Sequence, residues 1–366
     1  MSRKISEIDK NLLQQTDLPE GITVHDIFKP PFRLYGFYKP LETGLLERGS
    51  RQIQADESIN DGRMLLRNTA GGRVRFATNS KTVALCVKLP NRTVFSHMTQ
   101  AAVCGFDMYA ECDGANRHAK TFLPPADVTQ LEYTNVFTFE EAKMRTLTIN
   151  FPLYNDVTSL FIGLDEGADV EEAPLYRNET PIVFYAGSIT QGCSASRPGM
   201  CHTNILSRWL DSDILNLGLS GSDKGEPALA RYIADLPMSA FVHGYGYNSP
   251  SIEYFEQTYY PFYKIIREKH PHIPILMVSC PVPITLKEEK RKDLLTRRRE
   301  VTMNAYLKAR REGDTNVWFV DGFDALGADG EEATIDGGHF TDLGYINMAK
   351  CLMPLLSRLL GSEEKV

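Results

Sequence analysis

Several residues in the second half of the chain have the types that acyl transfer through a serine requires. Ser188 lies in "AGSIT", directly after an apolar run. A serine hydroxyl is a weak nucleophile unless an imidazole accepts its proton and an acidic group orients that imidazole. Asp336 and His339, in the glycine-rich "IDGGHF", have the types that supply both, and Thr341 suits the N-cap of a final helix. The sequence therefore predicts Ser188 as nucleophile, His339 as general base and Asp336 as the acid that orients the base.

An acyl-transfer site also needs hydrogen-bond donors for the oxyanion, and each missing donor costs about 3 to 4 kcal/mol of transition-state stabilisation. The candidates are the backbone N–H of Ser188, the backbone N–H of Gly221 in "NLGLSG" and the side-chain amide of Asn248 in "GYGYNS". Each residue alone has an ordinary structural interpretation as a turn residue or a helix cap. All of these residues are expected directly after strands, and this shared placement favours their interpretation as catalytic and oxyanion-binding residues.

Other residues near Ser188 offer alternatives. His202 follows on an expected helix, where it packs or caps more readily than it acts as a base, and His243 falls inside an expected strand. Cys193 is close to Ser188, but nothing basic stands beside it in the sequence. The chain has no GxSxG around Ser188, no GxGxxG after a strand and no GxxxxGK[ST], which argues against an α/β-hydrolase elbow and against nucleotide binding.

The candidate residues need a scaffold that gathers them, and the pattern after Pro181 predicts one. Short apolar segments alternate there with stretches of helical period, which indicates a parallel sheet covered by helices on both faces. The expected strands are residues 182–187, 213–220, 239–246, 274–280 and 317–322. Ligands bind such sheets beyond the carboxyl ends of the strands. The candidate residues follow the first, second, third and fifth of these strands.

The first half of the chain has a different pattern. From about residue 20 to residue 175, apolar residues alternate or form short runs separated by Gly, Asn, Asp and Pro clusters. Short strands joined by turns predict an antiparallel β-sandwich. The charged "DEGADVEEAPLYRNETP" then indicates a boundary, so we expect a sandwich domain at residues 1–175 and a second domain at 176–366. The aromatic "FRLYGFYKP" or the loop "NRTVFSHMTQ" of the sandwich would help to cover the site.

Composition narrows the classes of protein. A chain of 366 residues with 42% hydrophobic and 24% charged residues is typical of a globular protein. The net charge of −7 argues against nucleic-acid binding. The basic residues between Lys287 and Glu300 alternate with acidic ones, which predicts a solvated, self-paired helix face. Without a signal sequence or a long apolar run, we expect a cytoplasmic protein with no membrane contact.

Seven cysteines without a CxxC pair indicate reduced thiols, and no zinc site is expected. No metal or organic cofactor is expected to take part.

The candidate residues resemble a known family. Ser188 in "GSIT", Gly221 in "NLGLSG", Asn248 in "GYNS", and Asp336 with His339 in "DGGHFTDLGY" resemble the four sequence blocks of the SGNH, or GDSL-type, hydrolases. The resemblance covers about residues 180 to 360, and "INFPLYNDVTSLFIGLDEGA" is similar to a subgroup with an N-terminal β-sandwich. It implies a flavodoxin-like α/β/α domain with a five-stranded parallel sheet, preceded by a jelly-roll-like antiparallel sandwich.

The same resemblance implies a serine esterase that forms an acyl-enzyme on Ser188 and needs no cofactor. Its expected substrate is a small O-acyl ester, with acetyl as the acyl group and a carbohydrate as the alcohol. An acyltransferase with the same intermediate and a carbohydrate-binding protein with a decayed site are the alternatives, and the oligomeric state is left open. The chain departs from the family pattern at Ala186 and Gly187, before the serine, at Ser249, and at Gly244 and Gly246, where the subgroup tends to carry acids.

Overall fold

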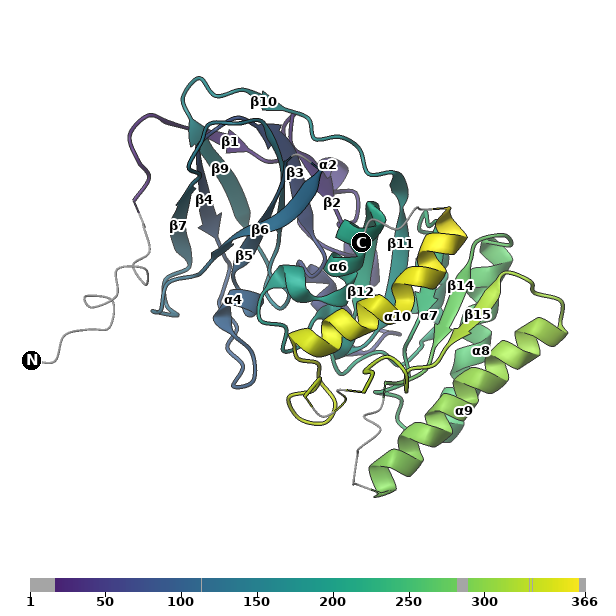
Figure 1. The fold of residues 1–366 in the computed structure, drawn as a ribbon. Coiled ribbons are helices and arrows are strands. Elements are labelled where there is room, and N and C mark those ends of the chain that lie inside the picture. The colour runs from purple at the N-terminus through teal and green to yellow at the C-terminus, as the bar shows by residue number, and fades with distance from the viewer. Residues whose placement is uncertain (1–16, 113, 282–288, 329, 331, 362–366) are drawn as a thin grey trace, which may run out of the picture.

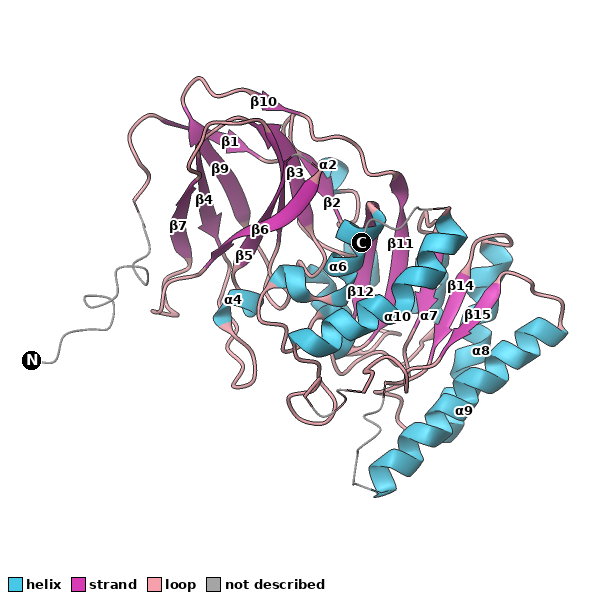
Figure 2. Ribbon diagram, viewed as in Figure 1, coloured by secondary structure: helices cyan, strands magenta, loops and turns pink. Residues whose placement is uncertain are grey.

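The computed structural model describes residues 17–361 except 113, 282–288, 329 and 331 (Figures 1 and 2). Residues 1–16, which include most of the segment used to infer cellular location, lie outside the described part, as do residues 287 and 288 of the basic stretch. Among the described helices, none combines the length and apolar composition that a membrane span requires.

The first half of the chain forms two antiparallel sheets that pack face to face, which confirms the predicted β-sandwich. One sheet has the strand order β1-β9-β4-β7, and the other has the order β10-β3-β8-β5-β6, with β2 paired to β3. The strands are β1 (Ile22–Asp26), β2 (Arg33–Tyr35), β3 (Arg73–Thr78), β4 (Thr82–Lys88), β5 (Phe106–Cys112), β6 (Ala115–Phe122), β7 (Glu132–Thr138), β8 (Arg145–Asn150), β9 (Ser159–Asp165) and β10 (Val170–Glu171).

Short helical segments connect these strands. They are α2 (Pro40–Thr43), α3 (Arg51–Gln54), η2 (Asp61–Arg67) and α4 (Gln100–Val103). The segment around α3 leaves the sandwich and packs on the second half of the chain. There the buried Arg48 donates hydrogen bonds of 2.8 Å to the backbone carbonyls of both Asn216 and Gly218. The first half of the chain therefore helps to hold the strand end that precedes Gly221.

The second half of the chain forms the predicted five-stranded parallel sheet. Its order, β12-β11-β13-β14-β15, places the first strand between the second and the third, as in flavodoxin-like folds. The strands are β11 (Asn178–Ala186), β12 (Ser212–Gly218), β13 (Ala240–His243), β14 (Ile275–Val278) and β15 (Val317–Val320). This order brings the ends of β12, β11 and β13 next to one another, so Ser188 follows a strand in the interior of the sheet.

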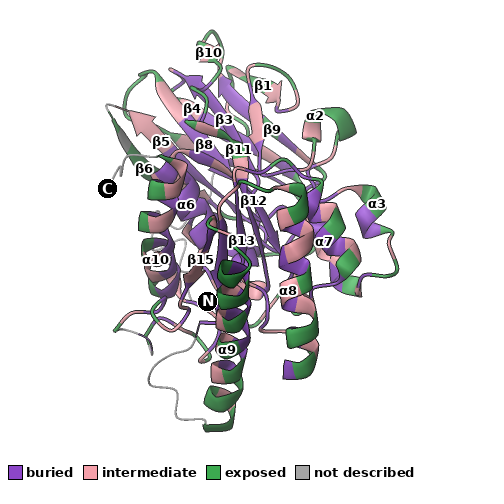
Figure 3. Cartoon of the chain, turned by 90° about the vertical axis from the view of Figure 1, so that its right-hand side faces the viewer, coloured by how far each residue is buried: buried purple, intermediate pink, exposed green. Residues whose placement is uncertain are grey.

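Helices cover both faces of this sheet (Figure 3). Successive strand residues point to opposite faces, so Phe184 packs with α6 and α10 while Tyr185 packs with α7 and α8. The helices are α5 (Ser188–Gln191), η3 (Pro198–Met200), α6 (His202–Leu210), α7 (Pro227–Ala234), α8 (Ile252–Lys269), α9 (Glu289–Arg311) and α10 (Asp342–Leu360).

Helix α9 is only partly the solvated face that the sequence predicts. Arg298 is 7% exposed and donates a hydrogen bond of 2.8 Å to the carbonyl of Ser249, and Arg299 pairs with Asp321. These arginines anchor the helix to the loops at the carboxyl edge of the sheet, instead of pairing with acidic residues of their own helix.

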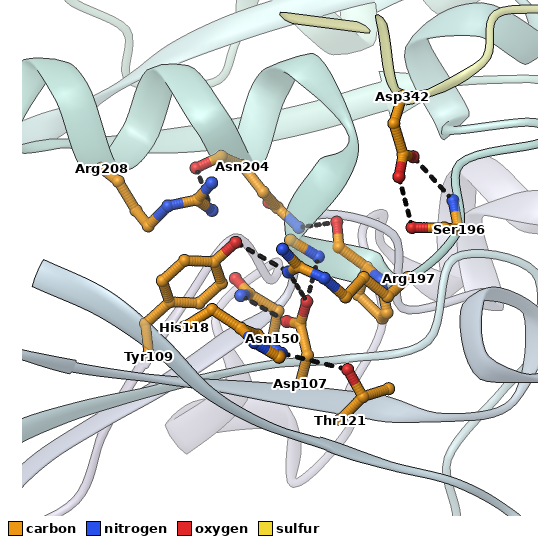
Figure 4. Close-up of polar contacts among 12 residues, drawn as sticks. Asp107, Tyr109, His118, Thr121, Asn150, Ser196, Arg197, Asn204, Arg208 and Asp342 are labelled. Atoms are coloured by element: carbon orange, nitrogen blue, oxygen red, sulfur yellow. Dashed lines mark hydrogen bonds and ion pairs between the residues drawn. The ribbon is translucent and has the colours of Figure 1, made fainter.

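A buried polar network joins the sandwich to the loop after α5 (Figure 4). Asp107 of β5 is fully buried and lies 2.6 Å from Nη1 of Arg197. It also accepts hydrogen bonds of 2.8 Å from the Asn150 side chain and from the backbone N–H of Gly199. Each buried carboxylate oxygen thus has a donor, which the burial of a charge requires. The network attaches the sandwich firmly to the half of the chain that carries Ser188.

Candidate active site

Ser188 is the first residue of α5 and follows the interior strand β11 after a single glycine. The helix has one turn and ends at Gly192, whose φ of +111° is in the region that favours glycine. The Oγ atom of Ser188 lies 3.0 Å from Nε2 of His339. A hydroxyl and an imidazole that are far apart in the sequence are therefore in direct hydrogen-bond contact.

His339 is oriented by Asp336 in a tight turn before α10. Nδ1 of His339 lies 2.7 Å from Oδ2 of Asp336. The other carboxylate oxygen accepts hydrogen bonds from the backbone N–H groups of Gly338 (3.0 Å) and His339 (2.8 Å). The structure thus brings Ser188, His339 and Asp336 together in one chain of hydrogen bonds, in the order that the sequence predicts.

Thr341 occupies the predicted N-cap position of α10, but its side chain does not cap the helix. Its hydroxyl donates instead to the carbonyl of Glu332, at 2.9 Å. This bond ties the start of α10 to the loop before Asp336.

The first turn of α10 is also held from the other side of the site. Asp342 accepts hydrogen bonds from the backbone N–H of Ser196 (2.9 Å) and from its hydroxyl (2.5 Å), and Figure 4 shows this pair beside the Asp107 network. Thr99 of the sandwich donates a bond of 2.7 Å to the carbonyl of the same serine. Because Asp342 follows His339 closely, the sandwich contributes to the position of the imidazole.

The environment of the pair shifts both pKa values. Burial of Asp336 opposes ionisation, but the hydrogen bonds from His339 outweigh it and lower the pKa of this carboxyl. The sulfur of Cys193 and then the carboxylate of Asp336 stabilise the imidazolium, and together they raise the pKa of His339 to about 9 against the opposing effect of burial. The site therefore holds a proton on the imidazole more strongly than water would.

Cys193 has a basic neighbour that its sequence surroundings do not show. This buried free thiol lies 3.4 Å from Nε2 of His97, which is in the loop between β4 and α4. The ring of His97 also lies 5.9 Å from that of His339. The sandwich loop "NRTVFSHMTQ" thus brings a second imidazole beside the first.

Asn248 lies at the edge of the site and is held by an acid that the sequence analysis misses. Its side-chain Nδ2 donates to Oδ1 of Asp223, and the backbone N–H of Gly246 donates to Oδ2 at 3.1 Å. Burial of Asp223 raises the pKa of this carboxyl to about 6. Asn248 does not cap the next helix, because Ser251 takes that position and accepts from the N–H of Tyr254. The available signal for Asp223 is an acidic residue just after Gly221, at the same strand end.

Gly187 makes room for this pair. A Cβ atom at position 187 would lie 2.6 Å from Oδ1 of Asp223 and 2.9 Å from Nδ2 of Asn248, closer than real Cβ contacts. The family's Asp or Ser before the nucleophile would therefore collide with the Asp223 carboxylate. The departure at Gly187 follows from the position of Asp223.

The remaining sequence candidates lie as follows. Gly221 is in the turn after β12 with a φ of +67°, and it is not one of the residues that line the cavity. His202 stacks on Tyr345 with ring centroids 5.9 Å apart, and His243 stacks on Tyr259 at 4.2 Å. Burial lowers the pKa of both histidines to about 3, so both are neutral. They pack as aromatic rings, as the sequence analysis prefers.

A cavity of about 270 Å³ opens at Ser188. Its lining has a largely polar part, called the rim below, and a mostly apolar part. The rim comprises Gly187, Ser188, Asp223, Tyr247, Asn248, Ser279, Pro281, Arg291, Asp336, Gly338 and His339, and the rest of the lining comprises Phe184, Ala186, Ile189, Thr190, His202, Val242, Gly244, Val278, Met348 and Leu352. Within the described residues, no group of three His, Cys, Asp or Glu side chains is arranged to hold a metal ion.

Comparisons with known proteins agree with this arrangement. Residues 179–357 match the GDSL-like lipase/acylhydrolase family, and residues 29–170 match the N-terminal region of SGNH-type esterases. The chain is similar to a structure described as a GDSL-like lipase from Bacteroides ovatus ATCC 8483, with 27% identity and a TM-score of 0.84, over 94% of this chain and 100% of that one. No curated protein matches the chain.

Two further structures share the fold at lower identity. The salicylyl-acyltransferase SsfX3 from a tetracycline biosynthetic pathway has 20% identity and a TM-score of 0.73, over 93% of this chain and 98% of that one. A family two carbohydrate esterase from Cellvibrio japonicus has 12% identity and a TM-score of 0.57, with the same coverage of 93% and 98%. The two family matches, which span residues 29–170 and 179–357, show that the chain belongs to the SGNH, or GDSL-type, hydrolases that carry an N-terminal β-sandwich.

Proposed function

We propose that the protein is a serine esterase that cleaves small O-acyl esters through an acyl-enzyme on Ser188. The observation that carries this proposal is the hydrogen-bonded chain from Ser188 Oγ to His339 Nε2 (3.0 Å) and from His339 Nδ1 to Asp336 (2.7 Å). This geometry supplies a nucleophile, a base within reach of its proton and a group that orients the base.

In the first half of the reaction, Ser188 attacks the ester carbonyl while His339 accepts the hydroxyl proton. The carboxylate of Asp336 holds the imidazole in the required tautomer and stabilises the imidazolium. His339 then donates the proton to the departing alcohol, which leaves an acyl group on Ser188. In the second half, His339 accepts a proton from water as the water oxygen attacks the acyl carbonyl. The bond between the acyl group and Ser188 Oγ then breaks, the acid departs, and His339 returns the proton to Oγ.

The oxyanion of the tetrahedral intermediate needs donors in fixed positions. The backbone N–H of Ser188 at the start of α5 and the side-chain amide of Asn248 line the cavity beside the hydroxyl. Because Nδ2 has two hydrogens and one is donated to Asp223, the other is available for the oxyanion. The N–H of Gly221 is the third proposed donor.

For the alcohol part of the ester we propose a carbohydrate or another polar small molecule. The shared architecture with family two carbohydrate esterases, one of which was solved with cellohexaose, supports this proposal. The polar rim of the cavity, with Arg291, Tyr247 and Asn248, offers hydrogen-bond groups to such an alcohol. The proposed acyl group is small, and acetyl, the group that the family resemblance implies, is tested first.

The test is hydrolysis of p-nitrophenyl acetate and of acetylated sugars by the wild type and by Ser188→Ala, with products identified by mass. We expect turnover that the substitution abolishes. Equal rates in the two proteins would favour a carbohydrate-binding protein with a decayed site. Transfer of the acyl group to an added alcohol in preference to water would instead identify an acyltransferase. This is the second candidate function, because the salicylyl-acyltransferase SsfX3 shares the fold.

A further inference from the structure

The cavity at Ser188 continues below the serine into the layer between the parallel sheet and α10. Its walls there come from the ends of β11, β13 and β14 and from one face of α10. These side chains are almost completely buried, with exposed fractions of 1% for Phe184, 5% for Val278, 4% for Met348 and 1% for Leu352. The apolar part of the cavity is therefore surrounded by protein, and the cavity opens beside Asp336 and His339, whose side chains are 49% and 33% exposed.

Gly244 has no side chain, and this leaves the apolar part of the cavity open. A Cβ atom built on Gly244 would meet only Cβ of Ala186, at 3.6 Å, and Cβ of Val278, at 3.7 Å, which are ordinary contact distances. The backbone of Gly244 is also outside the left-handed region, so it does not require a glycine. Gly246 differs, because its φ of +145° and a Phe255 atom at 2.6 Å both exclude a side chain. The glycine at position 244 thus leaves room beside Ser188 that a larger residue would fill.

The chemistry of the walls decides which part of an ester fits there. A sugar carries hydroxyl groups, and burying them against hydrocarbon without partners costs free energy. The deep walls are mostly Phe, Ala, Ile, Val, Met and Leu side chains, with Thr190 and the ring of His202 as the polar ones. Burial keeps this imidazole neutral, since its pKa is lowered to about 3. A closed apolar space suits the free end of a hydrocarbon chain, whereas the polar alcohol suits the open rim.

We propose that the space between β11, β13 and α10, opened by Gly244, is an acyl-binding pocket that selects acyl groups longer than acetyl, of butanoyl to hexanoyl length. The inference rests on the proposed esterase function and specifies the acyl half of its substrate. An acetyl group would react at the rim and leave the pocket empty. A longer chain would place its methylene groups against Val278, Met348 and Leu352.

The test measures kcat/KM for a series of p-nitrophenyl esters from acetate to dodecanoate. Each value is divided by kcat/KM for the acetate. The ratio does not depend on the amount of folded enzyme. We expect it to rise on the order of fourfold for each methylene that enters the pocket, until the pocket is filled, and then to fall. A ratio that falls steadily from the acetate would overturn the inference, while Ser188-dependent turnover of the acetate would still support the esterase.

Variants at position 244 test the location of the pocket. Gly244→Val should remove the preference for butanoate and hexanoate over acetate in these ratios, because the added methyl groups fill the space below Ser188. Gly244→Ala is the matched control: its single carbon sits at ordinary contact distance and should reduce mainly the longest accepted chain. Met348→Ala should move the preference toward longer acids. An unchanged chain-length profile in all three variants would place the acyl group elsewhere.

Discussion

The buried carboxylate of Asp223 accepts a hydrogen bond from the side-chain amide of Asn248, and this pair lies directly beside Gly187 and Ser188. The acid fixes which way the amide points and leaves its second hydrogen for the proposed oxyanion site. Asp223 is thus a positioning residue that acts through Asn248.

Removal of the Asp223 carboxylate should weaken the proposed oxyanion site and leave the nucleophile Ser188 in place. We expect Asp223→Ala to lower kcat by about 100- to 1,000-fold, the usual cost of one oxyanion donor, with a smaller change in KM. Asn248→Ala should have a similar effect, and the double variant should be little worse than either single one, since one change removes the donor and the other removes the group that positions it. Steady-state kinetics check this, and additive losses in the double variant would mean that the two residues act independently.

A side chain at position 187 should disturb the same pair from the other side. Gly187→Ala would place a Cβ atom 2.6 Å from the Asp223 carboxylate, so we expect a clear loss of kcat. Gly221→Ala is a useful comparison, because no atom lies within 4 Å of its added carbon. That variant retains the backbone N–H and should lose stability, by about 1 to 2 kcal/mol for the left-handed backbone. Kinetics and thermal unfolding together distinguish the two cases.

The pH profile should reflect the environment of His339. The histidine acts as a base only when neutral, and its pKa is raised to about 9, against about 6.5 for an unperturbed histidine. The acid limb of kcat/KM should therefore lie well above pH 6.5, with activity that rises toward pH 9. Because the sulfur of Cys193 is the main cause of the shift, Cys193→Ala should move the limb to lower pH. A limb at the same pH in both proteins would show that the thiol has no influence on the base.

The raised pKa also predicts how stability depends on pH. A group that binds its proton more tightly in the folded state stabilises the fold fully below its unfolded pKa, and this contribution is lost as pH rises through the folded value. For His339 the contribution should decline between about pH 6.5 and about pH 9. His339→Gln should flatten this part of the stability profile, as measured by denaturant unfolding at several pH values.

The Asp107 network should matter for stability. Asp107 is fully buried and pairs with Arg197, whose side chain is 19% exposed, so Asp107→Ala leaves a cation without its partner. We expect a loss of about 3 to 5 kcal/mol in the free energy of unfolding. The matched control is Glu172→Ala, since its pair with Arg33 is at the surface, with side chains 53% and 35% exposed, and should contribute less than about 1 kcal/mol. Similar losses in both variants would contradict a structural role for the buried network.

Much of the scaffold follows from local patterns. Short apolar segments that alternate with helical stretches indicate the parallel sheet, because strands buried on both faces have short, continuous hydrophobic sequences. The local pattern is weaker in two strands of the sandwich, β6 and β7. Their sequences, "ANRHAKTF" and "EYTNVFT", mix polar and apolar residues, and several of their side chains remain exposed or half-buried.

The sequence by itself identifies the candidate residues that lie within short motifs at strand ends: Ser188, Asp336, His339, Asn248 and Gly221. These residues can be predicted from the expected strands alone, because ligands bind parallel sheets beyond the carboxyl ends of the strands, which lie at one edge of the sheet. The tertiary structure alone decides what fills the space between those ends. The contact of Cys193 with His97, the buried partner of Asn248 and the pocket left by Gly244 all join residues from different elements, and only packing in three dimensions brings such residues within contact distance.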